Sequence, residues 1–138
     1  MSSKPASLLD KADKATATLN YAVELTQLAA TVGFDWPDVE GVINKIHEEL
    51  NEVQYEIDNG KVAERLHDEI GDLLFACTNL ARHLNIDPDS ALQSTNNKFK
   101  RRFEFIENQV LAQNKSLTDC SLDELDALWD KAKLLETK

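Results

Sequence analysis

Two short acidic motifs in this chain have the spacing of a metal site. In the segment Lys45–Glu52, Glu49 and Glu52 are three residues apart, and further along the chain Glu69 and Asp72 form a second pair with the same spacing. Carboxylates three apart on a helix lie on one face, so two such pairs on neighbouring helices could supply four oxygen ligands. Oxygen ligands suit a hard divalent cation such as Mg²⁺, which is typical of phosphate chemistry.

The surroundings of the second pair favour a metal over a solvated acidic surface. Glu69 and Asp72 lie in a segment whose apolar residues are too many for a single stripe, which predicts a helix buried on most sides. Carboxylates on a buried helix must be paired, protonated or bound to metal. Four of them close together would titrate as a coupled group with raised pKa values, and a divalent cation would relieve the repulsion. The alternative is a non-catalytic interaction module with a solvated acidic face.

Basic residues that could hold phosphates are concentrated in residues 97–103. Lys98 and Arg102 are four apart on a common face, where an ammonium and a guanidinium could grip neighbouring phosphate oxygens. Lys100 and Arg101 could equally offset surface acids. The chain has no GxxxxGK[ST] or GxGxxG motif, so metal and basic side chains would have to carry the phosphates of a nucleotide. Trp36 could stack on a base or seal the end of a helical bundle.

Other metal sites do not match the sequence. The three histidines form no HExxH motif, and neither cysteine belongs to a CxxC pair, which argues against zinc. A di-iron carboxylate bundle needs two ExxH units, whereas the chain offers one, at Glu64–His67. The acidic motifs therefore point to Mg²⁺ rather than to zinc or a di-iron centre.

The elements that must position these residues are helices. Apolar periodicity predicts an all-α bundle of four to five helices with short connections and no strands. The expected helices cover residues 7–30, 38–59, 61–84, 88–113 and a short last segment from 122. Ser7 is expected to cap the first, Gly60 to stop the second, Asp87 to cap the fourth, and Ser121 to open the last through a capping box with Glu124.

Composition limits the class of protein. At 138 residues the chain is expected to form one domain, with residues 1–31 as a leading helix and 32–133 as the motif-bearing core. A net charge of −10 argues against a nucleic acid polymer as the main partner. Two cysteines are too few for a disulfide framework, and no membrane span or signal peptide is recognisable, so a cytoplasmic protein is expected.

Three motifs in order resemble the MazG family of all-α nucleoside triphosphate pyrophosphohydrolases. They are KxxEExxE at 45–52, ExxD at 69–72 and NxKFxxRF at 96–103. The stretches Val32–Trp36, Gly71–Phe75 and Asn79–Leu84 are also similar, and the likeness extends from about Val32 to Lys133. The chain is most similar to the second domain of the larger, two-domain MazG proteins, here standing alone.

The resemblance implies hydrolysis of a nucleoside triphosphate between the α and β phosphates, releasing the monophosphate and pyrophosphate. Deoxynucleoside triphosphates are the expected substrates, and Mg²⁺, with Mn²⁺ as a substitute, is the expected cofactor. The residues implied as metal ligands are Glu49, Glu52, Glu69 and Asp72. Those implied to contact substrate are Lys45, Arg65, Lys98 and Arg102, at the phosphates, with Trp36 and Asn79 as further candidates. Glu48 or Glu49 is the candidate to orient the attacking water.

The resemblance also implies a homo-oligomer, either a dimer or a dimer of dimers. A helix that is apolar around most of its circumference, as predicted for residues 61–84, agrees with this because one small chain can hardly cover it. The dimeric dUTPases of the same superfamily share the carboxylate pairs. A dUTPase-type enzyme is therefore the alternative to a MazG-type pyrophosphohydrolase. Base and sugar preference depend on a few hydrogen bonds that the sequence does not reveal.

Overall fold

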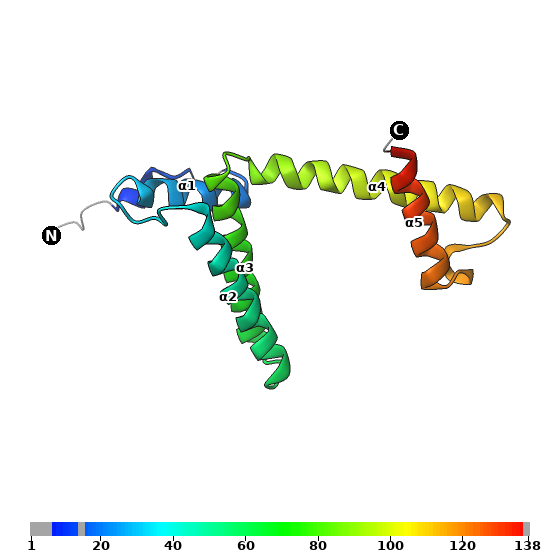
Figure 1. The fold of residues 1–138 in the computed structure, drawn as a ribbon, viewed down its shortest axis with the longest axis horizontal. Helices are drawn as coiled ribbons and strands as arrows, with labels where there is room; N and C mark the ends of the chain where they lie inside the picture. Colours follow the sequence, from blue (N-terminus) through cyan, green and yellow to red (C-terminus); the bar gives the residue numbers. More distant parts are fainter. Residues whose placement is uncertain (1–6, 14–15, 137–138) are drawn as a thin grey trace, which may run out of the picture. The chain divides into compact units, whose positions relative to one another are not determined.

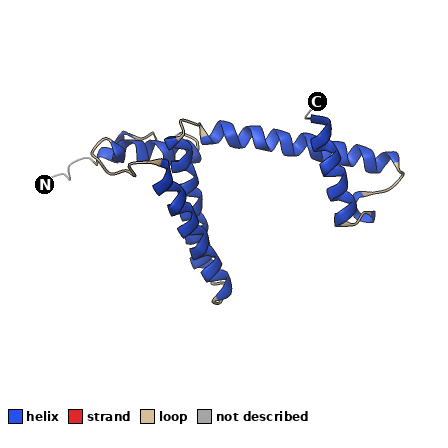
Figure 2. Ribbon diagram, in the orientation of Figure 1, coloured by secondary structure: helices blue, strands red, loops and turns tan. Residues whose placement is uncertain are grey.

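The computed structural model describes residues 7–13 and 16–136, and every regular element in them is helical (Figures 1 and 2). The α-helices are α1 (Thr18–Ala30), α2 (Val39–Asp58), α3 (Ala63–His83), α4 (Pro88–Ala112) and α5 (Leu122–Glu136). Two 3₁₀ turns, η1 (Leu8–Lys11) and η2 (Leu117–Asp119), precede α1 and α5. The all-α prediction is confirmed, and none of the described helices is long and apolar enough to cross a membrane.

The first predicted helix is shorter than expected. Instead of one helix over residues 7–30, the chain forms the turn η1, and α1 begins only at Thr18. Ser7 is a cap as predicted, because its hydroxyl accepts the N–H of Leu9, but the turn it starts ends at Ala12, whose ψ of 137° is extended. The apolar spacing continues across this break, so periodicity alone could not detect it. Contacts between η1 and α1 hold the two segments together.

Helices α2 and α3 form the hairpin on which the acidic motifs lie. The carboxylate of Asp38 caps α2 by accepting the N–H of Gly41 at 3.1 Å. The hairpin turn uses two positive φ angles, 121° at Gly60 and 53° at Lys61, and the value at Gly60 is one that residues with a Cβ rarely adopt. The prediction that Gly60 stops the second helix is confirmed. The two helices then pack along each other.

Helix α3 packs against both α1 and α2, but it is not buried on most sides. Val42 and Val53 of α2 and Ala76 of α3 are buried, whereas Ile70 and Leu74 of α3 are exposed. The prediction of a largely buried third helix is therefore wrong for the single chain. The reason is geometric, because two neighbouring helices cover only part of a helix circumference.

The chain separates into two compact units, Met1–Ala91 and Leu92–Lys138. The second unit contains most of α4 together with α5, and its buried side chains are Ile106, Val110 and Ala132. The prediction of a single domain over residues 1–138 stays a prediction.

The predicted caps of α4 and α5 are confirmed. The carboxylate of Asp87 accepts the N–H groups of Asp89 and Ser90 at the start of α4. At the start of α5, the hydroxyl of Ser121 accepts the N–H of Glu124 and donates to its carboxylate. These caps satisfy N–H groups that have no partner inside the helix, and so they define where each helix begins.

Candidate active site

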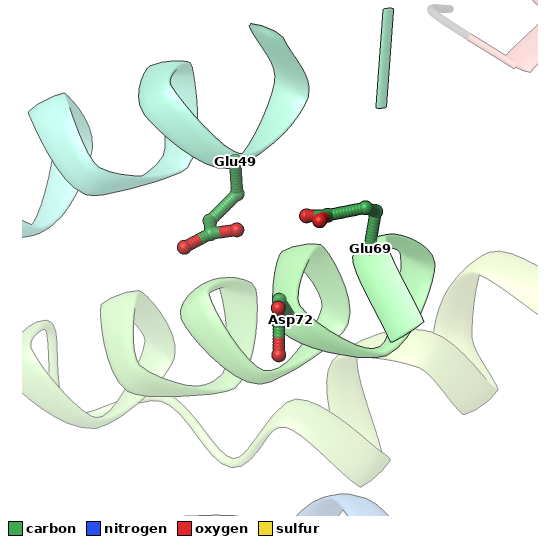
Figure 3. Close-up of side chains that lie close together, drawn as sticks. All are labelled: Glu49, Glu69 and Asp72. Carbon is green, nitrogen blue, oxygen red and sulfur yellow. The ribbon is translucent and has the colours of Figure 1, made fainter. Parts of the chain in front are cut away.

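Three of the predicted metal ligands converge between α2 and α3. They are Glu49, Glu69 and Asp72 (Figure 3). Each contributes one carboxylate oxygen to a cluster in which the three oxygens lie within 4.8 Å of one another. Glu69 and Asp72 are almost one turn apart on α3, and the hairpin brings Glu49 of α2 opposite them. Glu49 is buried, Glu69 is half-buried and Asp72 is exposed, so the group extends from the helix interface to solvent.

The fourth predicted ligand, Glu52, lies outside this group but influences it. Its side chain is exposed on α2, one turn beyond Glu49. Partial burial, followed by the negative charges of Glu52 and Asp72, raises the pKa of Glu69. Carboxylates whose pKa is raised by their neighbours favour a bound cation, because the cation removes the repulsion that opposes ionisation.

Lys45 pairs with Glu49 and neutralises part of the acidic charge. Its ammonium is 3.1 Å from a carboxylate oxygen of Glu49 and 3.4 Å from one of Glu48. The hydrogen bond to Glu49 raises the pKa of Lys45, so the lysine is cationic. Of the two acids predicted to orient water, Glu49 belongs to the converging group, whereas Glu48 is exposed and pairs with Lys45.

Glu56 is an acid of this face to which the sequence assigned no role. It lies one turn beyond Glu52 on α2 and is buried, with 8% of its surface exposed. Within residues 7–13 and 16–136, its Oε2 atom has no hydrogen-bond partner. Its shared face with Glu49 and Glu52 was visible in the spacing, but its burial depends on how α2 packs on α3.

A pocket of about 830 Å³ adjoins the acids. Its acidic end is lined by Lys45, Glu49 and Asp72. Its apolar wall comes from η1, α1, the segment before α2, and α3, and consists of Leu9, Leu25, Ala29, Phe34, Trp36 and Phe75. Asn79 and Arg82 add polar groups from α3. The size and mixed lining are those of a small-molecule site.

The predicted substrate contacts divide between the two units. Trp36, Asn79 and Lys45 line the pocket, and their contact with substrate stays a prediction. Arg65 is exposed near the start of α3 and is not part of the pocket wall. Lys98 and Arg102 lie on α4 in the second unit, and their contact with phosphates stays a prediction.

Arg102 is already engaged within its own unit. Its guanidinium is 2.8 Å from the carboxylate of Glu136, and it lies 5.3 Å from the ring centroid of Trp129. Arg101 pairs with the same carboxylate at 2.8 Å, and Lys100 lies 3.8 Å from Glu104. Lys100 and Arg101 thus follow the interpretation in which basic residues offset surface acids.

Two further residues at the pocket were missed by sequence reasoning. Asp35, in the segment between α1 and α2, accepts a hydrogen bond from Arg82 near the end of α3 at 2.6 Å. Both line the pocket. They belong to stretches that carry the family resemblance, Val32–Trp36 and Asn79–Leu84, and this was the available signal for them. Nothing in the spacing indicated that the two stretches meet.

Comparisons with known proteins identify relatives of this chain. Residues 38–105 match the model of the MazG nucleotide pyrophosphohydrolase domain. The chain is 39% identical over 131 residues to a nucleoside triphosphate pyrophosphohydrolase of Escherichia coli, covering 94% of this chain and 50% of that protein. It is 38% identical over 130 residues to the nucleoside triphosphate pyrophosphohydrolase/pyrophosphatase MazG of Thermotoga maritima, covering 94% and 49%.

The chain therefore spans about half the length of the curated relatives it matches. The matched domain begins at the residue that caps α2 and includes the three converging acids. The acidic hairpin, the pocket beside it and these similarities together lead to one conclusion: this chain belongs to the MazG family.

Proposed function

We propose that this chain hydrolyses nucleoside triphosphates to the monophosphate and pyrophosphate in a Mg²⁺-dependent reaction. The observation that carries the proposal is the convergence of Glu49, Glu69 and Asp72 at one end of a pocket with an aromatic wall. The relatives described as nucleoside triphosphate pyrophosphohydrolases support the same reaction. An acidic site can bind a polyanion only if a cation lies between them, so the metal is part of the proposal.

The donor set fits Mg²⁺. Glu49, Glu69 and Asp72 offer carboxylate oxygens, Glu52 lies one turn away, and no histidine or cysteine of the described residues joins the group. Hard oxygen donors suit Mg²⁺ and the similar Mn²⁺ better than zinc or copper. A bound divalent ion would neutralise charge developing on the phosphates and lower the pKa of a bound water.

The side chains of the pocket divide the remaining tasks. We assign Glu49 to accept a hydrogen bond from the attacking water, because it combines burial with a place in the acid group. Lys45 beside it would stabilise negative charge on the α-phosphate. Trp36 and Phe34 would contact the nucleoside, and Asn79 would hydrogen-bond to it. The preference for deoxyribose follows from the family resemblance.

Product analysis tests the reaction. The purified chain is incubated with a panel of ribo- and deoxyribonucleoside triphosphates and Mg²⁺, and pyrophosphate and orthophosphate are measured separately. We expect pyrophosphate, no orthophosphate, and complete inhibition by EDTA. In H₂¹⁸O the label should enter the monophosphate, because water attacks the α-phosphorus and the bond to the bridging oxygen breaks. Label in pyrophosphate would contradict attack at that atom.

Two other outcomes would replace the proposal. Hydrolysis of dUTP alone would indicate the dUTPase-type alternative. Absence of hydrolysis, together with flat calorimetric titrations with Mg²⁺ and nucleotide, would indicate the non-catalytic interaction module. Glu64→Gln is a matched control for the site variants, because Glu64 is an exposed acid in the first turn of the same helix, α3.

We also propose that the chain forms a homodimer or a dimer of dimers. The support is the apolar surface of the hairpin: Leu50 is 51% exposed on α2, and Leu74 is 54% exposed on α3. Exposed apolar stripes of this kind are typical of surfaces that pair with a second copy. Sedimentation at micromolar concentration should give at least twice the mass of one chain, and Leu74→Glu should lower it. A monomer at all concentrations would contradict the proposal.

A further inference from the structure

We propose that Asp35 is a positioning residue, which acts through Arg82 to hold both Trp36 and Asn79 in place at the apolar end of the pocket. The inference rests on the proposed function, because it assigns a task at the same site. It concerns residues of the pocket wall other than the converging acids. None of the groups involved is a predicted metal ligand.

One carboxylate oxygen of Asp35 joins two distant segments of the chain. Its Oδ1 accepts a hydrogen bond from Nη2 of Arg82 at 2.6 Å, lies 2.9 Å from Nε2 of His83, and accepts the backbone N–H of Trp36 at 2.8 Å. Arg82 and His83 are the next-to-last and last residues of α3, whereas Asp35 lies in the segment between α1 and α2. The oxygen therefore ties the Trp36 backbone directly to the end of α3.

Arg82 extends the same connection to Asn79. Its Nε donates to Oδ1 of Asn79 at 3.0 Å while Nη2 donates to Asp35. Because the guanidinium is planar and rigid, the two acceptors are held at a fixed separation. The amide oxygen of Asn79 is then occupied by Arg82, and its NH₂ is the group that remains to donate to a ligand. A nucleobase with an acceptor atom is the chemistry that this donor fits.

Burial and charge make the connection strong. The side chains of Arg82, His83 and Asp35 are only 14%, 10% and 23% exposed, so water competes weakly for their hydrogen bonds. The hydrogen bond from Arg82 is the main cause that lowers the pKa of Asp35 to about 2, so the carboxylate is ionised at neutral pH. Removing Asp35 would leave a poorly hydrated guanidinium without its counter-charge, which is costly.

The indole of Trp36 has a second support in α2. A Cβ atom added to Gly41 would lie 3.1 Å from Cε3 of the Trp36 ring, so the ring lies directly against the backbone of the first turn of α2. Glycine leaves the space that the ring occupies. Asp35 thus holds the backbone of Trp36 and Gly41 provides room for its side chain, so that the ring lines the pocket.

Fluorescence of Trp36 tests the inference without nucleotide. The chain contains two tryptophans, so Trp129→Phe leaves Trp36 as the only reporter. In that background we expect Asp35→Ala to increase the acrylamide quenching constant of Trp36 at least about two-fold. Asp35→Asn keeps an acceptor oxygen, so its quenching constant should lie between those of the Trp129→Phe background and of Asp35→Ala. Glu40→Gln removes a nearby exposed charge and should leave the quenching constant unchanged. Unchanged quenching in Asp35→Ala would overturn the inference.

Kinetics supply the second readout. With Trp129 intact, Asp35→Ala should raise KM for the nucleoside triphosphate about 10-fold and change kcat less than about 3-fold, because nucleoside contacts are lost while the acids are untouched. Arg82→Lys keeps the charge but cannot hold both acceptors, so it should give a smaller change in the same direction. Arg82→Lys also replaces Asp35→Ala as the test variant if Asp35→Ala does not fold. A fall in kcat at unchanged KM in the Asp35 variant would overturn the inference. If the parent chain is inactive but the quenching changes are as expected, only the proposed function is contradicted.

Discussion

Acidic side chains are compensated very differently in the two units of this protein. In the unit Leu92–Lys138, the carboxylate of Glu136 pairs with Arg101 and with Arg102, each at 2.8 Å. These two guanidinium groups, Arg102 first, lower the pKa of Glu136 to about 2. In the unit Met1–Ala91, Glu49 pairs with Lys45 and lies close to Glu69 and Asp72, and the pKa of Glu69 is raised instead.

The difference separates a structural acid from acids held for a ligand. Glu136 has more positive than negative charge around it, so its interactions are complete within the unit. The three converging acids carry more negative charge than the ammonium of Lys45 offsets, because Lys45 also pairs with Glu48, and a divalent cation would reduce this surplus. Burial of Glu49 makes the surplus costly without a cation.

Neutralising one of the converging acids should nearly abolish hydrolysis. Glu69→Gln and Asp72→Asn keep the shape of the side chain and remove one ligand charge, and each should lower the rate of pyrophosphate release about 100-fold or more. Far-UV circular dichroism should be unchanged, because neither carboxylate caps a helix. Full activity in either variant, with Glu64→Gln as the matched control, would show that the converging acids are not the site.

Binding of a divalent cation should stabilise the protein. At about 100 times its dissociation constant, Mg²⁺ or Mn²⁺ should add about 2.7 kcal/mol to the free energy of unfolding, and EDTA should reverse the effect. Thermal unfolding with and without the metal measures it. Glu69→Gln should lose most of this stabilisation and Glu136→Gln should keep all of it. Equal metal responses in the two variants would remove the distinction between the two kinds of acid.

The two arginines on Glu136 should differ in their contribution to stability. The side chain of Arg102 is 14% exposed and lies over Trp129, whereas that of Arg101 is 60% exposed. Arg102→Gln should therefore cost about 1–2 kcal/mol, through lost packing and cation–π contact, and Arg101→Gln about 0.5 kcal/mol or less. Urea unfolding followed by tryptophan fluorescence measures both. A larger loss in the Arg101 variant would contradict this ranking.

The smallest expected effect is the pH dependence that Glu136 confers. Its pKa is about 2 in the folded chain and near 4.5 in the unfolded one, so its stabilisation is present above pH 4.5 and is lost as the pH falls towards 2. The melting temperatures of the parent and Glu136→Gln should differ at pH 6 and converge at low pH. A difference that persists at pH 2 would mean that the carboxylate does not act through its charge.

The hairpin that carries the acids was predictable because its signals are local. Asp38 caps α2, Gly60 ends it with a positive φ, and the three-residue spacing of Glu69 and Asp72 places both on one face of α3. Capping, turn conformation and helical periodicity depend on residues a few positions apart. The convergence of Glu49 with Glu69 and Asp72 was expected once two adjacent helices were predicted, but Glu52, expected in the same group, lies outside it.

The failures all concern relations between distant segments. The break between η1 and α1 leaves the apolar spacing intact, so only the packing of η1 on α1 distinguishes two pieces from one helix. The exposure of Leu74 depends on how much of α3 its neighbours cover. The hydrogen bond between Asp35 and Arg82 joins residues 47 positions apart, and no local rule relates them.

The amino-acid sequence was enough to predict helices α2 to α5, the caps at Asp87 and Ser121, and the acids and bases available for chemistry, because these depend on residues a few positions apart. Packing between segments brings Glu49, and not Glu52, to Glu69 and Asp72, and it places Trp36 and Asn79 in the wall of the same pocket. It also decided that Arg102 is paired with Glu136. The physical reason is that periodicity determines the face on which a side chain lies, whereas its partner depends on packing between segments distant in the chain.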